Sequence, residues 1–129
     1  MKEFEDIKIV SMDDASSHRP DPNMAMFNIV LGLSSSAPHE WASYFNQSWK
    51  QHIYMTKRRA SVSGRKLEIY CVPDELENDH IPELNKVIVE TNNAYKAFLT
   101  KQTQQEAARQ EQEVAEKEHL KSIKNNLKF

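Results

Sequence analysis

Cysteine and glycine are scarce in this chain, and their scarcity argues against several kinds of site. Cys71 is the single cysteine, so the chain can build neither an intramolecular disulfide framework nor a cysteine-rich zinc site. Because Cys71 lies in an apolar run, we interpret it as an inert buried thiol rather than a nucleophile. The whole chain contains two glycines, which are too few for a phosphate-binding glycine loop.

Long apolar runs and an excess of charge of one sign are also lacking. Residues 1–6 contain no apolar signal-peptide core, and no stretch of about 18 consecutive apolar residues could form a transmembrane helix. The formal net charge of −2 creates no overall attraction to nucleic acid or to an anionic membrane. We therefore expect a cytoplasmic protein with no membrane partner.

Recognisable catalytic patterns are absent too. None of the five histidines has another histidine three or four residues away, and nucleophile-elbow and serine-triad patterns are missing. The densest titratable cluster surrounds His80, and an acidic helix-capping turn explains it without a metal. Its members are Asp74, Glu77, Asp79 and His80. The sequence predicts no enzyme activity, no metal ligand and no cofactor.

The most ordered pattern in the chain runs from Met24 to Tyr54. Residues 24–33 alternate as a buried strand with one face formed by Phe27, Ile29, Leu31 and Leu33, and residues 38–52 follow as an amphipathic helix. Capping hydroxyls from Ser34 to Ser36 suit its start, although these serines could also hold an anion. An aromatic stripe predicts its buried face, while its outer rings, Tyr44 and Trp49, could instead line a groove or a subunit interface. The stripe is Trp41, Tyr44, Phe45 and Trp49.

Strand patterns also occur on both sides of this segment. Residues 4–12 and 54–62 read as strands, and residues 65–72 as a further strand after a Ser63-Gly64 turn, with Leu67, Ile69 and Cys71 facing the core. Residues 13–23 carry prolines and polar residues without periodicity, which predicts a long loop. Gly32 inside a strand indicates a bulge or a close approach of the first helix to the sheet.

A long helix is predicted after His80. Pro82 is tolerated in its first turn, and an apolar stripe predicts its buried face. The stripe consists of Leu84, Val87, Ile88, Thr91, Tyr95, Phe98 and Leu99.

The resulting order is strand, strand, helix, strand, strand, helix. It predicts an α+β fold in which two helices cover one face of a four-stranded antiparallel sheet. This is the order of a ferredoxin-like sandwich whose last strand has been moved to the N-terminus. The second strand should then lie between the first and the fourth, with the third strand at the far edge.

The chain should divide into an α+β domain at residues 1–99 and a helical extension at residues 100–129. The extension is rich in Gln, Glu and Lys, favours helix, and has no large apolar residue between Leu99 and Val114. Apolar residues return near helical spacing at its end, and this suggests contact with a second copy or with another protein. They are Leu120, Ile123, Leu127 and Phe129.

A basic hairpin is the most suggestive polar feature. Five cations within ten residues could follow a phosphate backbone, in which case binding would weaken with salt. They could equally protect an edge strand against pairing with other sheets. The residues are Lys57, Arg58, Arg59, Arg65 and Lys66.

Three functions remain open, and the third is ranked last because no acid–base or nucleophile pair is visible. The leading hypothesis is a non-enzymatic protein-interaction or oligomerisation module that uses its sheet face and its long C-terminal helix. The alternative is a nucleic-acid-binding protein that uses the hairpin at residues 57–66. The third is a small-molecule-binding sandwich with Tyr70, His39 or the loop at residues 13–23 near a pocket.

Overall fold

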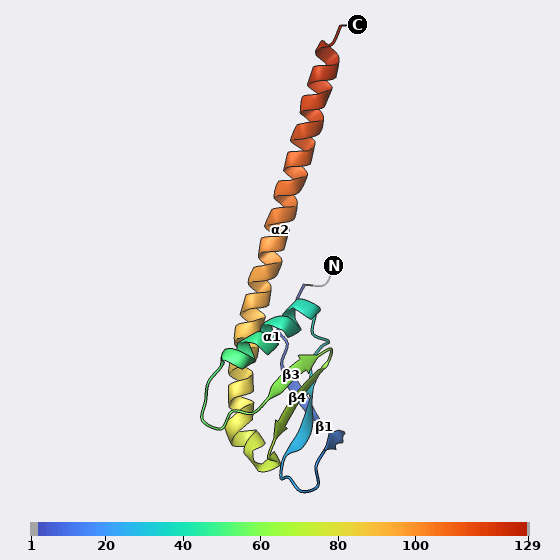
Figure 1. The fold of residues 1–129 in the computed structure, drawn as a ribbon. Helices are drawn as coiled ribbons and strands as arrows, with labels where there is room; N and C mark the ends of the chain where they lie inside the picture. The colour runs from blue at the N-terminus through green and yellow to red at the C-terminus, as the bar shows by residue number, and fades with distance from the viewer. Residues whose placement is uncertain (1–2, 129) are drawn as a thin grey trace. The chain divides into compact units, whose positions relative to one another are not determined.

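The computed structural model describes residues 3–128 and confirms a mixed α+β chain with a long C-terminal helix (Figure 1). The strands are β1 (Ile9–His18), β2 (Phe27–Leu33), β3 (Ala60–Ser63) and β4 (Lys66–Cys71). The helices are α1 (His39–Gln51) and α2 (Ile81–Asn126), and a 3₁₀ turn (Pro73–Glu75) and a π-helical turn (Leu76–His80) lead into α2. The chain divides into two compact units, Met1–Tyr95 and Lys96–Phe129.

The four strands form one antiparallel sheet in the order β1-β2-β4-β3. The predicted neighbours are therefore correct, with β2 between β1 and β4 and β3 at the edge. Ile29 pairs with Ile69 and Leu31 with Leu67, so the inward-facing residues of the central strands lie opposite one another. The β3–β4 turn is Gly64-Arg65, one residue later than predicted, and Gly64 supplies its positive φ of 60°.

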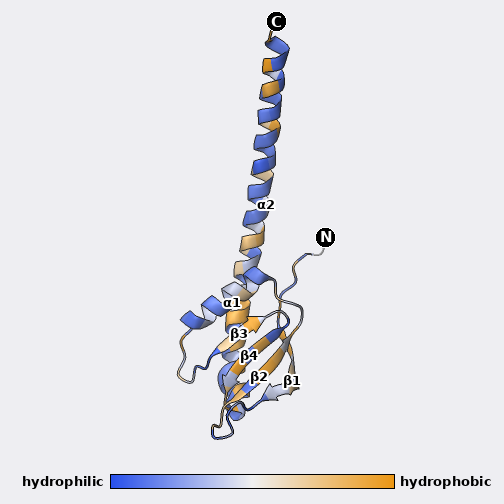
Figure 2. Cartoon of the chain, turned by 45° about the vertical axis from the view of Figure 1, so that its right-hand side comes forward, coloured by the Kyte–Doolittle hydropathy of each residue, from blue (hydrophilic) through white to orange (hydrophobic). Residues whose placement is uncertain are grey.

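The core is built from the sheet, α1 and the first part of α2. The prediction that Trp41, Phe45 and Trp49 are buried is confirmed, since each is at most 2% exposed. Their rings stack along α1 with centroids 5.9 and 6.2 Å apart. In Figure 2 the strands carry most of the hydrophobic colour. The same unit buries apolar side chains of the central strands and of the first part of α2, namely Ile29, Leu31, Leu33, Leu67, Ile69, Leu84 and Val87.

The first strand differs from its prediction at both ends. It starts at Ile9 and continues to His18 through residues predicted as loop, so the connection to β2 covers only residues 19–26. Polar groups replace regular ladder bonds here: Ser17 Oγ donates to Asp13 O at 2.7 Å and accepts the Val30 N–H at 2.9 Å. The register shifts between Asp13 and His18, so the strand can continue without apolar alternation.

Two further strands are shorter than predicted. β2 begins at Phe27 rather than Met24, and β3 begins at Ala60 rather than Tyr54. Residues 52–59 form a loop because side chains tie them to the neighbouring helical segments. Lys57 Nζ donates to Lys50 O at 3.0 Å, and the Tyr54 hydroxyl lies 2.7 Å from His80 Nδ1.

The predicted helix caps are wrong. α1 has Pro38 at its N-cap and no side-chain capping bond, because Ser34 Oγ instead accepts the Lys8 N–H at 3.1 Å. The acidic helix-capping turn predicted from Asp74 and Glu77 likewise makes no side-chain capping bond, since a 3₁₀ turn and a π-helical turn run directly into α2.

The side chain that leaves little room at Gly32 belongs to β1 and not to a helix. A Cβ at this position would lie 2.2 Å from Ser11 Oγ. The register also shifts between Ile9 and Ser11, which supports the bulge interpretation. The three atoms nearest to such a Cβ all belong to Ser11, so the close neighbour of Gly32 is β1 and not the first helix.

Candidate functional site

The C-terminal part of α2 exposes a compact apolar patch. Every side chain from residue 100 to residue 128 is exposed. Leu120, Ile123 and Leu127, here called the tip patch, are 65%, 44% and 55% exposed. Leu127 directly follows Asn126, the last residue of α2, and its N–H still donates to Ile123 O at 3.1 Å. At helical spacing the three positions, i, i+3 and i+7, fall within an arc of about 60°. Phe129, predicted with them, lies outside the described residues.

Charge is unevenly distributed along the same helix. Arg109 bridges Glu106 and Glu113 within the segment before the tip patch. After Glu118 the sequence contains Lys121, Lys124 and Lys128 but no acidic residue. Among residues 3–128, no ion pair involves Lys121 or Lys124. The C-terminal turns are therefore basic, and the turns before them are mainly acidic.

A shallow hollow of about 530 Å³ lies on the segment before the tip patch. We call it the acidic hollow, because carboxylates flank small apolar side chains in it. Val114, at 56% exposure, is its largest apolar residue. The lining is Ala107, Gln110, Glu111, Val114, Ala115 and Glu118.

Most of the basic hairpin residues have partners within the chain. Arg58 donates two hydrogen bonds to the Glu75 carboxylate, at 3.2 and 3.1 Å. Arg65 donates to Leu33 O at 3.1 Å, while the Arg59 guanidinium lies 5.7 Å from the Tyr70 ring centroid. Lys57 Nζ bonds the end of α1, as described above. Lys66, on β4, is exposed. The five cations thus serve several different contacts.

The β3 edge is covered by α1, and the sequence interpretation missed the residue responsible. Asn46 Oδ1 accepts the Val62 N–H at 2.8 Å, and Asn46 Nδ2 donates to Val62 O at 3.3 Å. Trp49 Nε1 donates to Arg58 O at 2.9 Å, just before the strand. A side-chain amide therefore occupies backbone groups through which another strand could pair.

A second missed asparagine performs the same task at the N-terminal segment. Asn92 Oδ1 accepts the Ile7 N–H at 3.0 Å, and Asn92 Nδ2 donates to Ile7 O at 2.9 Å. The same Oδ1 accepts Trp41 Nε1 at 2.9 Å. Asn92 is only 4% exposed, so its amide satisfies three polar groups inside the core.

A buried polar network surrounds His80, which is 0% exposed. His80 Nδ1 lies 2.7 Å from the Tyr54 hydroxyl, and Nε2 lies 3.3 Å from Glu75 Oε1. The carboxylate partner of His80 is Glu75, which is not part of the cluster of Asp74, Glu77 and Asp79 singled out in the sequence. The hydrogen bonds from Arg58 hold the pKa of Glu75 below its usual value.

The contacts of this network stabilise the fold. Burial raises the pKa of Tyr54 to about 12, so its hydroxyl stays protonated at neutral pH. The network joins the loop before β3 to the turns before α2. Within residues 3–128, no group of three or more His, Cys, Asp or Glu side chains could hold a metal ion.

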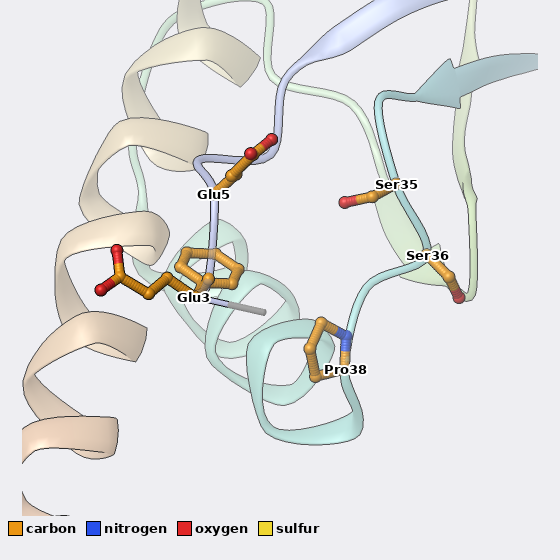
Figure 3. A pocket seen from close by; sticks show the side chains of 6 residues that line it. Glu3, Glu5, Ser35, Ser36 and Pro38 are labelled. Carbon is orange, nitrogen blue, oxygen red and sulfur yellow. The ribbon is translucent and has the colours of Figure 1, made fainter. Parts of the chain in front are cut away.

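A wide hollow of the α+β unit lies beside the serines that precede α1. It has a volume of about 660 Å³ and is lined by Glu3, Phe4, Glu5, Ser35, Ser36 and Pro38. Figure 3 shows the Ser35 hydroxyl directed toward the hollow and the Ser36 hydroxyl directed away from it. The two carboxylates disfavour the anion considered for these serines.

Two other hollows concern the small-molecule hypothesis and the sheet face. Tyr70 lines one of about 400 Å³ beside Arg59, Ser61 and Glu68. His39 is exposed at the start of α1 and does not line it. A hollow of about 500 Å³ on the sheet contains Val10 and Val30 beside Arg65 and Lys66.

Within the part of the chain that the structure describes, no helix is long and apolar enough to cross a membrane. The chain matches no protein-family model, and comparisons with curated proteins and with solved structures find no similar protein.

Proposed function

We propose that the protein is a non-enzymatic interaction module that oligomerises or holds a protein partner through the C-terminal part of α2. The observation that carries the proposal is the tip patch: three large aliphatic side chains at helical spacing, at the end of a helix that buries no side chain after residue 100. Full burial of such a side chain is worth about 1.5–3 kcal/mol. A partner that covers the patch would therefore gain several kcal/mol before the costs of association.

The stability of the exposed helix supports the same conclusion. Its internal support consists of short-range contacts such as those of Arg109 with Glu106 and Glu113, which are each worth about 0.2–0.5 kcal/mol. An exposed helix held by such pairs is marginal in water, because most helix stability in proteins comes from packing. A bound partner would supply that packing.

The test compares three proteins by light scattering over a range of concentrations. The variant Leu120→Gln/Ile123→Gln/Leu127→Gln removes the patch while keeping good helix formers. The matched control Ile53→Gln/Met55→Gln removes apolar side chains that are 88% and 104% exposed in the loop before β3. We expect the unmodified chain and the control to exceed the monomer mass, and the patch variant to remain monomeric. Equal masses for the patch variant and the unmodified chain would contradict the proposal.

The sheet is the second part of the proposed interaction surface. We infer that α1 and α2 cover one face of it, in the order of the ferredoxin-like sandwich described above. The shared contact of Trp41 and Ile7 with Asn92 supports this arrangement. The other face would then be open, and the hollow beside Val10 and Val30 is where we propose that a partner could touch it.

Nucleic-acid binding through the hairpin is the alternative, and the exposed residues Arg59, Arg65 and Lys66 favour it. The test is Lys66→Gln, because Lys66 has no hydrogen bond or ion pair among those described for residues 3–128. If the hairpin binds phosphates, this change lowers the salt slope of binding by roughly one. An unchanged slope, or no binding at about 50 mM salt, would contradict this alternative.

A further inference from the structure

We propose that the tip patch of one copy docks into the acidic hollow of a second copy, so that the chains associate head to tail. This inference rests on the proposed function and names the partner of the same surface. It concerns residues 96–128 only, and it combines charge, apolar contact and the position of the two surfaces around the helix.

Charge complementarity points to a second copy. The basic side chains around the tip patch are Lys121, Lys124 and Lys128. The acidic hollow contributes Glu111 and Glu118, for which the described chain provides no ion pair. Docking would bring these unpaired opposite charges together, whereas tip-to-tip packing would bring lysines against lysines. Juxtaposed like charges oppose association, so the charges favour the acidic hollow as the binding site.

The apolar parts of the two surfaces also match. Ala107, Val114 and Ala115 contribute small apolar side chains that larger aliphatic groups can approach closely, and Glu111 and Glu118 lie between Val114 and Ala115 around the helix. At 1.5 Å per residue, the tip patch extends about 10 Å along the axis and the acidic hollow about 16 Å. The longer surface can therefore receive the whole patch, and the flanking glutamates remain available to the lysines.

The positions of the two surfaces around the helix determine the form of the assembly. Ile123 follows Val114 by nine residues, which at 100° per residue places the two side chains on opposite faces of the helix. A straight helix cannot present both faces to the same neighbour. Each copy would thus donate its tip patch to one neighbour and receive the tip patch of another. Such heterologous contacts do not stop at a dimer. They generate a closed ring of copies or an open filament.

The experiment mixes two complementary variants of the full chain. The tip variant, Leu120→Gln/Ile123→Gln/Leu127→Gln, retains the acidic hollow. The hollow variant, Glu111→Lys/Glu118→Lys, retains the tip patch and repels incoming lysines. Circular dichroism checks that both remain as helical as the unmodified chain, and light scattering gives the masses.

We expect the mass of the unmodified chain to rise past that of a dimer with concentration, while each variant alone stays monomeric. An equimolar mixture should form a one-to-one heterodimer that grows no further, since only one tip patch and one acidic hollow remain functional. Raising the salt from about 50 to about 500 mM should weaken this heterodimer, because the charges are exposed.

Three results would overturn the inference, and they can be told apart. If the hollow variant assembles as the unmodified chain does while the tip variant is monomeric, the patch contacts another patch, and the proposed function survives. A mixture that stays monomeric also excludes head-to-tail docking. If the tip variant still assembles, both the inference and the proposed use of the tip patch fail.

Discussion

The two parts of α2 are continuous in sequence but differ in what stabilises them. From Ile81 to Tyr95 the helix buries a face that includes Leu84, Val87 and Ile88. From residue 100 to residue 128 it buries no side chain. The first part is held by packing, whereas the second relies on helix propensity and short-range pairs. The same secondary structure can therefore be part of a folded core or remain exposed on all sides.

Removing a core ring should have the largest effect on stability. Phe45→Ala deletes a fully buried ring between Trp41 and Trp49 and should cost about 3–5 kcal/mol of unfolding free energy. The matched change in the exposed helix, Val114→Ala, should stay within about 0.5 kcal/mol. Chemical denaturation followed by tryptophan fluorescence measures both. Similar costs for the two would contradict the division between a packed and an unpacked region.

Asn92 and Asn93 are adjacent in the packed part of α2, and they test whether burial decides the effect of a substitution there. Asn92→Ala leaves both backbone groups of Ile7 and the Trp41 Nε1–H without their partner, and should cost more than about 2 kcal/mol. Asn93 is exposed, so Asn93→Ala should change the unfolding free energy by less than about 0.5 kcal/mol. A small loss for Asn92→Ala would show that water replaces the amide.

Two arginine–glutamate pairs give a smaller, pH-dependent contrast. Arg58 lowers the pKa of Glu75, and Arg109 lowers that of Glu106. A carboxyl group whose pKa is lower in the folded chain than in the unfolded chain stabilises the folded form at pH values above its unfolded pKa of about 4.3. This stabilisation is lost as the pH falls through the folded pKa. Glu75→Gln should therefore flatten the decline of the domain's melting temperature between about pH 5 and pH 3. Glu106→Gln should leave that curve unchanged, and an equal effect of both would contradict this contrast.

Deleting residues 110–129 should have the smallest effect. Residues 110–128 contribute no buried side chain, so the unfolding free energy of the α+β unit should change by less than about 0.5 kcal/mol. The measurement should be made at a concentration at which the unmodified chain is monomeric, because assembly would itself raise the apparent stability. A clear drop in melting temperature would show that the exposed helix stabilises the domain.

Periodicity predicted the parts of the fold whose stability depends on apolar burial. The spacing of Trp41, Phe45 and Trp49 identified the buried face of α1, and Leu67, Ile69 and Cys71 identified that of β4. Element order and the crossover rule then gave the positions of the four strands in the sheet. The tip patch was visible for the same reason, because three aliphatic residues at helical spacing stand out in a polar segment.

Polar contacts between distant residues could not be predicted in this way. The cluster at His80 indicated nearby carboxylates, but only the folded chain pairs His80 with Tyr54 and Glu75. The basic hairpin likewise read as one surface until folding placed Arg58 against Glu75. The sequence shows which charged groups exist. Their partners depend on the conformation of loops, which no periodic pattern predicts.

The sequence by itself determined the α+β class, the aromatic face of α1, the strand order and the exposed apolar end of α2. The class, the aromatic face and the apolar end follow from the spacing of apolar residues, since a repeat of two or 3.6 residues places them on one face. The strand order follows from the order of the elements and the crossover rule. Only the tertiary structure decided where polar side chains satisfy the backbone, as Asn46 does at Val62 and Asn92 does at Ile7. An amide can bond any backbone group within reach, so which group it meets depends on the packing of elements far apart in the chain.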